Sequence, residues 1–214
     1  DVYKRQDLVS LYIADGKGGS DWAWCSPYVT RYTNNDNFDD ILAMLHEVRD
    51  LMRTRLRSNV AEHGDSNFWH WEPTFNDCAV VVILDEIQNW ITPAVKTKET
   101  KEKSEEFIAP VIDIVKKGRS AGITLIAMTQ KPTTDALPSV LCDNAALKVA
   151  FRCSTPEMAK SALGSLPDGS SSPTAIDFVQ KGMSVMTMDS GMAEYVQWDY
   201  LPESDIPALL DAVR

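Results

Sequence analysis

The alternation of apolar runs with helically spaced apolar positions predicts an α/β protein. Three short runs, residues 8–14, 79–84 and 123–128, contain almost no polar residue. Such runs are typical of parallel strands that are covered on both faces. We interpret residues 145–151 as a further buried strand of this kind. Because helices are expected between these strands, the pattern predicts a mainly parallel sheet.

The predicted helices follow from apolar residues that recur every three or four positions. Between Asn37 and Ser58 they lie at 38, 41, 45, 48, 52 and 56, which is the spacing of an amphipathic helix. The charged residues 95–106 are expected to form a solvated loop or the start of a helix. Shorter helices are expected at residues 107–117, 156–163 and 205–213, and a hairpin from residues 182–188 and 194–198.

Composition narrows the function classes only a little. The formal charge of −10 over 214 residues argues against a surface that is basic all over, so any contacts to nucleic acid must come from local loops or a ring pore. No stretch approaches the ~18 consecutive apolar residues of a membrane span, so no membrane contact is expected from this segment. The four cysteines form no CxxC pair, and neither a disulfide framework nor a zinc site is expected.

Two acids, Asp85 and Glu86, follow the apolar run 79–84 directly. In an open α/β sheet, ligands bind outside the carboxyl ends of the strands. Two adjacent carboxylates there can divide the work, Asp85 holding Mg²⁺ directly or through water and Glu86 polarising an attacking water. The alternative is that the two acids only start a loop or cap the next helix.

A second polar pair, Thr129-Gln130, follows the run 123–128. A glutamine side chain both donates and accepts hydrogen bonds, so Gln130 can sense a phosphate or orient water. The alternative is a polar turn before Pro132.

Several segments together point to one family. VVVILDE (80–86), KKGRSAGITLIAMTQKPTTDALP (116–138) and NAALKVAFRCST (144–155) resemble the Walker B strand, the R-x-A-G-I and T-Q-R-P segments, and the following strand of the FtsK/SpoIIIE family of DNA-translocating ATPases. Lys131 stands where that family usually has Arg. Upstream, LYIADGKGG (11–19) resembles the family's strand and D-x-K-G turn.

The resemblance continues at both sides of these motifs and covers residues 8–213. MRTRLRS (52–58) resembles the family's M-E-x-R helix, with Arg55 on the matching arginine, and the tail is similar to endings of the TraB-like plasmid-transfer branch. Within the chain itself, the crowded arginines of this helix have a simpler explanation as a solvated helix end. Trp22, Trp24, Trp69, Trp71 and Trp90 lack basic neighbours, so we expect them to serve packing and not base stacking.

The resemblance implies a RecA-like P-loop NTPase sheet that uses ATP and Mg²⁺. It implies catalytic roles for Glu86 and Gln130, and nucleotide contacts for Thr129 and for Asp85, which also takes the metal. It further implies a homo-oligomeric ring, a hexamer, in which Arg55 or else Arg119 reaches the nucleotide of the next subunit. The ring would move double-stranded DNA, in the cytoplasm or anchored at the inner face of the membrane.

Two alternatives stay open: a type VII secretion ATPase (EccC-like), which moves protein, and a non-catalytic interaction module.

One required motif is not in the sequence. A P-loop has the form G-x-x-x-x-G-K-[ST], and the stretch Asp15–Gly19 lacks both its spacing and the final hydroxyl. We therefore expect the fold to lack its first strand and P-loop, which the family order places upstream of Leu8. Residues 1–6, DVYKRQ, resemble a translated sequencing-adapter remnant, so residues 7–214 are interpreted as the C-terminal part of a motor domain.

Overall fold

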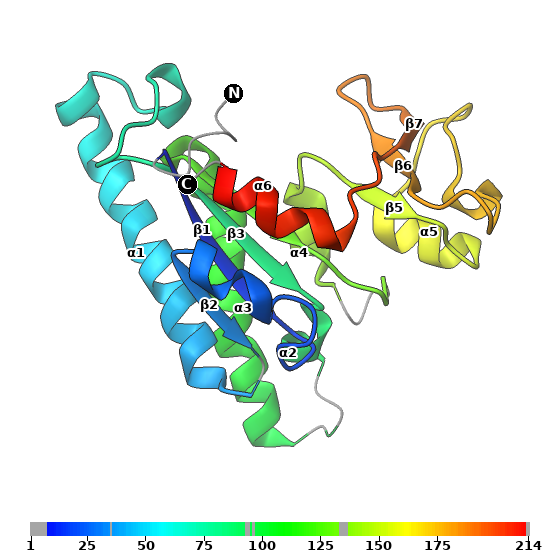
Figure 1. Ribbon diagram of the computed structural model, residues 1–214, viewed down its shortest axis with the longest axis horizontal. Coiled ribbons are helices and arrows are strands. Elements are labelled where there is room, and N and C mark those ends of the chain that lie inside the picture. Colours follow the sequence, from blue (N-terminus) through cyan, green and yellow to red (C-terminus); the bar gives the residue numbers. More distant parts are fainter. Residues whose placement is uncertain (1–7, 35, 93–94, 96, 133–136, 213–214) are drawn as a thin grey trace. The chain divides into compact units, whose positions relative to one another are not determined.

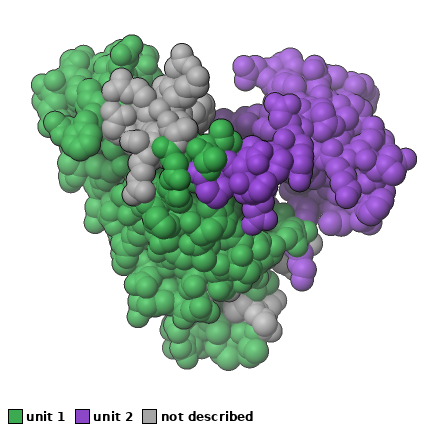
Figure 2. All heavy atoms as spheres, in the orientation of Figure 1, with its two compact units in different colours: residues 1–130, 208–214 green, residues 131–207 purple. Residues whose placement is uncertain are grey.

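The computed structural model describes residues 8–34, 36–92, 95, 97–132 and 137–212. The chain divides into two compact units, the first formed by residues 1–130 with 208–214 and the second by residues 131–207 (Figures 1 and 2). No helix among the described residues is long and apolar enough to cross a membrane.

The first unit is built on a four-stranded parallel sheet in the order β2-β1-β3-β4. Its strands are β1 (Val9–Asp15), β2 (Arg31–Asn34), β3 (Ala79–Asp85) and β4 (Ile123–Ala127). β1 and β3 pair over their whole lengths, from Val9 opposite Ala79 to Asp15 opposite Asp85. The predicted mainly parallel α/β fold is thus confirmed, and β2 is a strand that the sequence pattern did not indicate.

One face of this sheet is covered by the two long helices, α1 (Phe38–His63) and α3 (Lys98–Lys117), which pack against each other (Figure 1). On this face the side chains of Val80, Val82 and Leu84 are fully buried, whereas Val81 and Ile83, which alternate with them on β3, are only half-buried. The helix residues that complete the core are Ile41, Met44, Leu45, Val48 and Met52 of α1 and Phe107, Val111 and Ile114 of α3.

Both helices begin at side chains that accept hydrogen bonds from the first turn. Asn37 Oδ1 accepts from the backbone of Asp39 at 3.1 Å, and Thr97 forms a capping box with Thr100. The charged segment 98–106 is therefore helical and not a loop. Pairs four residues apart support its exposed face, Lys98–Glu102, Lys101–Glu105 and Glu99–Lys103.

The amino-terminal edge of the sheet is joined to α1 through Arg55. Its Nη1 donates to the carbonyl of Ala121 at 2.9 Å and its Nη2 to the carbonyl of Cys78 at 2.7 Å. Nη2 also pairs with Asp77 Oδ1 at 2.8 Å, and the guanidinium lies 4.9 Å from the centre of the Phe68 ring. Since Cys78 precedes β3 and Ala121 leads into β4, one buried side chain joins the starts of two adjacent strands.

The connection between α1 and β3 folds onto the same edge. The Phe68 ring packs against Gly122, where an added Cβ would lie 2.4 Å from the ring and the backbone has φ +72°. Trp69 Nε1 donates to the carbonyl of Arg119 at 2.8 Å. The aromatic residues of this connection therefore serve packing, as expected for Trp69.

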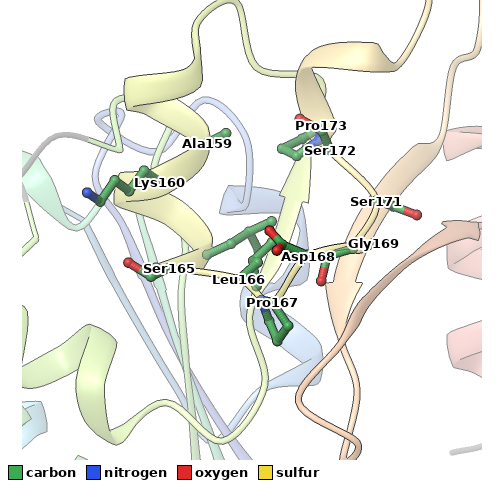
Figure 3. A pocket seen from close by; sticks show the side chains of 13 residues that line it. Ala159, Lys160, Ser165, Leu166, Pro167, Asp168, Gly169, Ser171, Ser172 and Pro173 are labelled. Carbon is green, nitrogen blue, oxygen red and sulfur yellow. The ribbon is translucent and has the colours of Figure 1, made fainter.

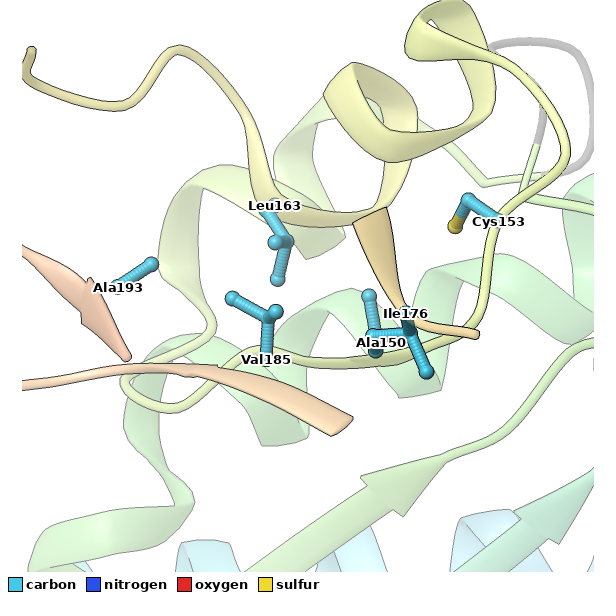
Figure 4. Packing of buried hydrophobic residues seen from close by; sticks show 6 residues of the cluster. All are labelled: Ala150, Cys153, Leu163, Ile176, Val185 and Ala193. Atoms are coloured by element: carbon cyan, nitrogen blue, oxygen red, sulfur yellow. The ribbon is translucent and has the colours of Figure 1, made fainter. Parts of the chain in front are cut away.

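The second unit contains a three-stranded antiparallel sheet, β5 (Val149–Phe151), β6 (Met183–Thr187) and β7 (Ala193–Gln197). Ala150, Val185 and Ala193 pack with Leu163 of α5 (Pro156–Leu163) in a small core (Figure 4). The hairpin β6–β7 and helix α5 were predicted.

The assignment of residues 145–151 to the parallel sheet was wrong. β5 covers only 149–151 and pairs antiparallel with β6. Ala150 is buried while Val149 and Phe151 are exposed, which is the alternation of a strand covered on one face.

The remaining elements are short. They are α2 (Gln88–Ile91), α4 (Ser139–Asn144), α6 (Ile206–Ala212) and the 3-10 helices η3 (Ala23–Tyr28), η4 (Phe68–His70), η5 (Gly118–Ala121), η6 (Pro173–Ala175) and η7 (Glu203–Asp205).

Replacing Arg55 by methionine should lower the free energy of unfolding by about 3–5 kcal/mol, because Asp77 and two carbonyls then lose a buried partner. Urea unfolding measures this loss. The matched control is Arg53→Met, two residues away, which removes an exposed ion pair with Asp113 and should cost at most about 1 kcal/mol. Equal losses for the two variants would contradict the structural role of Arg55.

Candidate active site

The carboxyl edge of the sheet brings β1 and β3 into unusually close contact. Beyond the last strand pair, the backbone of Gly16 donates to the carbonyl of Asp85 at 3.0 Å. A Cβ on residue 16 would lie 2.5 Å from that carbonyl oxygen and 2.8 Å from the carbonyl of Glu86. Because both obstacles are backbone atoms, only glycine fits here.

Asp15, the last residue of β1, organises the loop that follows. Its side chain is fully buried and accepts hydrogen bonds from three backbone amides, those of Lys17 at 2.7 Å, Asp21 at 3.2 Å and Trp22 at 3.1 Å. These bonds curl residues 16–22 back over the end of the sheet. The loop is therefore held by a carboxylate that is itself fully engaged.

Asp85 receives its partner from that loop, since Trp22 Nε1 donates to Asp85 Oδ2 at 3.0 Å. Burial raises the pKa of Asp85 above its ordinary value, and the negative charge of Glu86 raises it further, while the hydrogen bond from Trp22 opposes both. A nearby cation would stabilise the ionised form of a carboxyl group whose pKa is raised in this way. This is the chemistry expected of a metal-binding position.

Glu86 is buried, with 3% of its surface exposed, and its backbone has a φ of +50°. This left-handed turn is unusual for a residue with a side chain. Its Oε2 accepts from Gln88 Nε2 and from the backbone amide of Gln130 at 3.2 Å. Its Oε1 faces the ammonium group of Lys17 at 3.9 Å.

The turn after Glu86 is locked to the loop after β1. Asn89 donates from its backbone to the carbonyl of Glu86 at 2.9 Å and from Nδ2 to the carbonyl of Gly16 at 2.8 Å. Lys17 also donates to Asp21 Oδ2 at 2.7 Å, a bond that raises the pKa of Lys17 and keeps it charged. The site is thus a hydrogen-bonded corner in which Lys17 faces the buried carboxylate of Glu86.

The structure brings some of the expected site residues together and separates others. Asp85, Glu86 and Gln130 lie at one corner, and Thr129 directly precedes Gln130. Arg55 and Arg119 lie at the opposite edge of the sheet, about 20 Å away for a strand of this length. The buried contacts of Arg55 leave its guanidinium no route to another subunit, so its environment does not support the expected role; Arg119 has an exposed side chain.

Sequence reasoning missed Asp15, Lys17, Trp22, Gln88 and Asn89 as parts of the site. The D-x-K-G turn was noted, and because β1 and β3 were both predicted parallel strands, its place beside Asp85 could have been inferred. For Trp22 and Gln88 the sequence holds no signal, since a loop conformation decides where each side chain points.

Among the described residues, no group of three or more Asp, Glu, His or Cys side chains could hold a metal by itself. Asp85 suits Mg²⁺, which commonly takes one or two protein carboxylates and completes its shell with water and phosphate oxygens. A hollow lined by α5 and residues 164–173 lies wholly in the second unit and contains none of these groups (Figure 3).

Comparison with solved structures identifies the fold. No family model and no curated protein sequence matches the chain. The conjugation coupling protein TcpA of pCW3, in a monomer form with ATPγS, is similar at TM-score 0.75 and 16% identity over 98% of this chain and 58% of TcpA. EssC (ATPases 2 and 3) from Geobacillus thermodenitrificans is similar at TM-score 0.68 and 17% identity, over 98% of this chain and 37% of that one.

The cytoplasmic domain of the Thermomonospora curvata type VII secretion ATPase EccC matches at TM-score 0.65 and 15% identity, over 98% of this chain and 24% of that one. The likeness shows that the chain has the α/β fold of these ATPase domains. More narrowly, it is the fold of the FtsK/SpoIIIE-type ATPase domains, as the motifs had indicated. The chain spans less than two thirds of each of these proteins.

Replacing Asp85 by asparagine should stabilise the folded chain at pH 7. Because burial raises the pKa of Asp85 on folding, the folded state binds the proton more tightly, and the charged carboxylate destabilises the fold above that pKa. Asparagine removes the charge and keeps an acceptor for Trp22. The gain should shrink as the pH falls through the raised pKa and towards the ordinary aspartate value of about 3.9, and it should vanish well below that value, where both states are protonated.

Urea unfolding at several pH values measures this difference. Asp199→Asn, which removes the same charge from an exposed position, is the control and should show no such gain. An Asp85→Asn variant that is less stable than the parent at pH 7 would contradict the argument.

Proposed function

We propose that this chain is part of an ATP-hydrolysing motor whose catalytic acids are Asp85 and Glu86. The observation that supports this most directly is the corner at the carboxyl ends of β1, β3 and β4. There a buried Glu86 is held by donors from two segments, next to a carboxylate suited to Mg²⁺. The shared fold with ATPase domains supports the same conclusion.

In this role Glu86 accepts a proton from water while the water oxygen attacks the γ-phosphorus of ATP. The bond from that phosphorus to the β–γ bridging oxygen breaks, and its electron pair leaves with ADP. When bound at Asp85, Mg²⁺ neutralises charge on the phosphate oxygens. Thr129 and Gln130, at the end of the adjacent strand, are proposed to contact the γ-phosphate.

The phosphate cradle is proposed to come from a segment outside these 214 residues, because the sequence contains no G-x-x-x-x-G-K-[ST]. The chain is then the C-terminal part of the motor domain, inactive by itself. The motor is proposed to act in the cytoplasm as a homo-oligomeric ring, with Arg119 the remaining candidate for an arginine that acts across the subunit boundary.

For the substrate we propose double-stranded DNA, which the resemblance of the motifs to DNA-translocating ATPases favours. TcpA, of which this chain matches the larger part, supports this choice. A protein substrate is the second candidate, supported by the likeness to EssC and the type VII secretion ATPase EccC. The net charge of −10 does not distinguish a DNA substrate from a protein substrate, since a ring pore needs only a local basic lining.

The isolated chain should not bind Mg-ATP with micromolar affinity, because the backbone amides of a P-loop supply most phosphate contacts. Isothermal titration calorimetry measures this. A saturable isotherm in the micromolar range would mean that the 214 residues contain a complete nucleotide site. The proposal that the phosphate cradle lies on another segment would then be wrong.

In the full-length protein, Glu86→Gln should retain ATP binding and lose about 10²–10⁴-fold in hydrolysis rate, because an amide cannot take the proton from water. Near-normal turnover by Glu86→Gln would contradict the assignment of Glu86 as the general base.

Double-stranded DNA should stimulate the ATPase activity of the unmodified full-length protein, and the stimulation should weaken steeply with salt. Stimulation by a protein and not by DNA would select the second candidate.

A further inference from the structure

The Glu86 side chain is held on one side only. Both of its neutral donors, Gln88 Nε2 and the amide of Gln130, approach Oε2. Oε1 is left on the side of Lys17, whose side chain is 37% exposed. The two carboxylate oxygens of Glu86 are therefore not equivalent, and Gln88 supplies a side-chain donor to Oε2.

The orientation of the Gln88 amide follows from its partner. An ionised carboxylate only accepts hydrogen bonds, so the NH₂ group of Gln88 must face Glu86. This leaves Gln88 Oε1 buried and, among the described residues, without a hydrogen-bond partner. A buried acceptor without a partner destabilises the fold, so Gln88 is a poor choice for stability at this position.

From these two observations we propose that Gln88 is a positioning residue for Glu86. Its Nε2 fixes Oε2, so that Oε1 is the oxygen that receives the proton from the attacking water. The inference rests on the proposed ATP hydrolysis. It adds a residue outside the motifs noted in the sequence, two positions after the acid pair and at the start of α2.

The position of Gln88 in the turn supports this role. Glu86 has φ +50°, and its carbonyl accepts from Asn89, so the backbone turns back and places residue 88 beside the side chain of residue 86. Gln88 touches Glu86 but neither Asp85 nor the loop 16–22 among its described hydrogen bonds. Its effect on hydrolysis should therefore pass through Glu86 alone.

The test uses the full-length protein with Gln88→Met, which keeps the length of the side chain and removes both the donor and the orphaned acceptor. We expect kcat to fall about 10–100-fold with KM for ATP within about twofold, because a displaced base slows the chemical step and leaves binding intact. The melting temperature of the ligand-free protein should stay equal or rise. Gln88→Glu, of the same shape, should lower kcat at least as far.

A double-mutant cycle with Glu86→Gln makes the test specific. Adding Gln88→Met to Glu86→Gln should change kcat by less than about twofold, since the base through which Gln88 acts is already absent. An unchanged kcat for both Gln88 variants would overturn the proposal, and so would an undiminished effect in the Glu86→Gln background. A parallel fall in melting temperature and rise in KM would assign Gln88 a structural role instead.

Failure of the proposed function is distinguishable from these outcomes. If the unmodified full-length protein does not hydrolyse ATP, or if Glu86→Gln hydrolyses it normally, ATP hydrolysis by this corner is wrong. If the unmodified protein is active and Glu86→Gln is not, the corner stands and the Gln88 variants alone decide the inference.

Discussion

The parallel pairing of β1 with β3 is the constraint on which the rest of the first unit depends. Its register sets Asp15 opposite Asp85, and the pairing extends one step further through the bond from Gly16 to the Asp85 carbonyl. This extension requires a glycine, because a Cβ would lie 2.5 Å from the oxygen. The result places the loop after β1 against the turn after β3, and with it Lys17 and Trp22 against the acid pair.

The two edges of this sheet are built on different principles. At the amino-terminal edge, Arg55 is surrounded by acceptors and an aromatic ring, and its two hydrogen bonds to backbone carbonyls join α1 to the starts of β3 and β4. At the carboxyl edge, carboxylates are buried beside each other, and the pKa of Asp85 is raised as a consequence. Stabilising contacts are thus concentrated at the amino-terminal edge, where no ligand is expected. The unfavourable burial of negative charge occurs at the carboxyl edge, where ligands bind in open α/β sheets.

The sequence predicted those elements whose side-chain pattern is set by burial alone. The apolar run 79–84 predicted a central strand, and β3 does lie between β1 and β4, although only one of its faces is fully buried. Helix α1 followed from its apolar spacing. The stripe on α1 in fact continues through Arg55 and Asn59, both buried. A polar residue in register with an apolar stripe indicates a buried contact. This pattern argues against a role for Arg55 at the nucleotide of a neighbouring subunit.

Other elements could not be predicted because their conformation depends on tertiary partners. β2 is a four-residue edge strand of polar sequence, Arg31–Asn34, held by its pairing with β1. Residues 149–151 are apolar in sequence but alternate in burial, so their composition alone suggested a parallel sheet to which they do not belong. By contrast, the charge pairs of residues 98–105 were visible in the sequence and favour the helix that forms there.

The charges around Asp85 and Glu86 indicate how much positive charge a nucleotide site at this corner would need from elsewhere. Asp15 is satisfied by three amides, Trp22 donates to Asp85, and Glu86 has two neutral donors, so Lys17 is the one ammonium that faces the acid pair among the described ion pairs. A triphosphate carries several negative charges, and one lysine already paired with Asp21 cannot balance both it and the carboxylates. Under the proposed function, the remaining positive charge would come from Mg²⁺ at Asp85 and from amide-rich or basic groups of another segment. Under the proposed function, the corner is therefore the acidic half of a site, able to act on a phosphate that is held from elsewhere and unable to hold it alone.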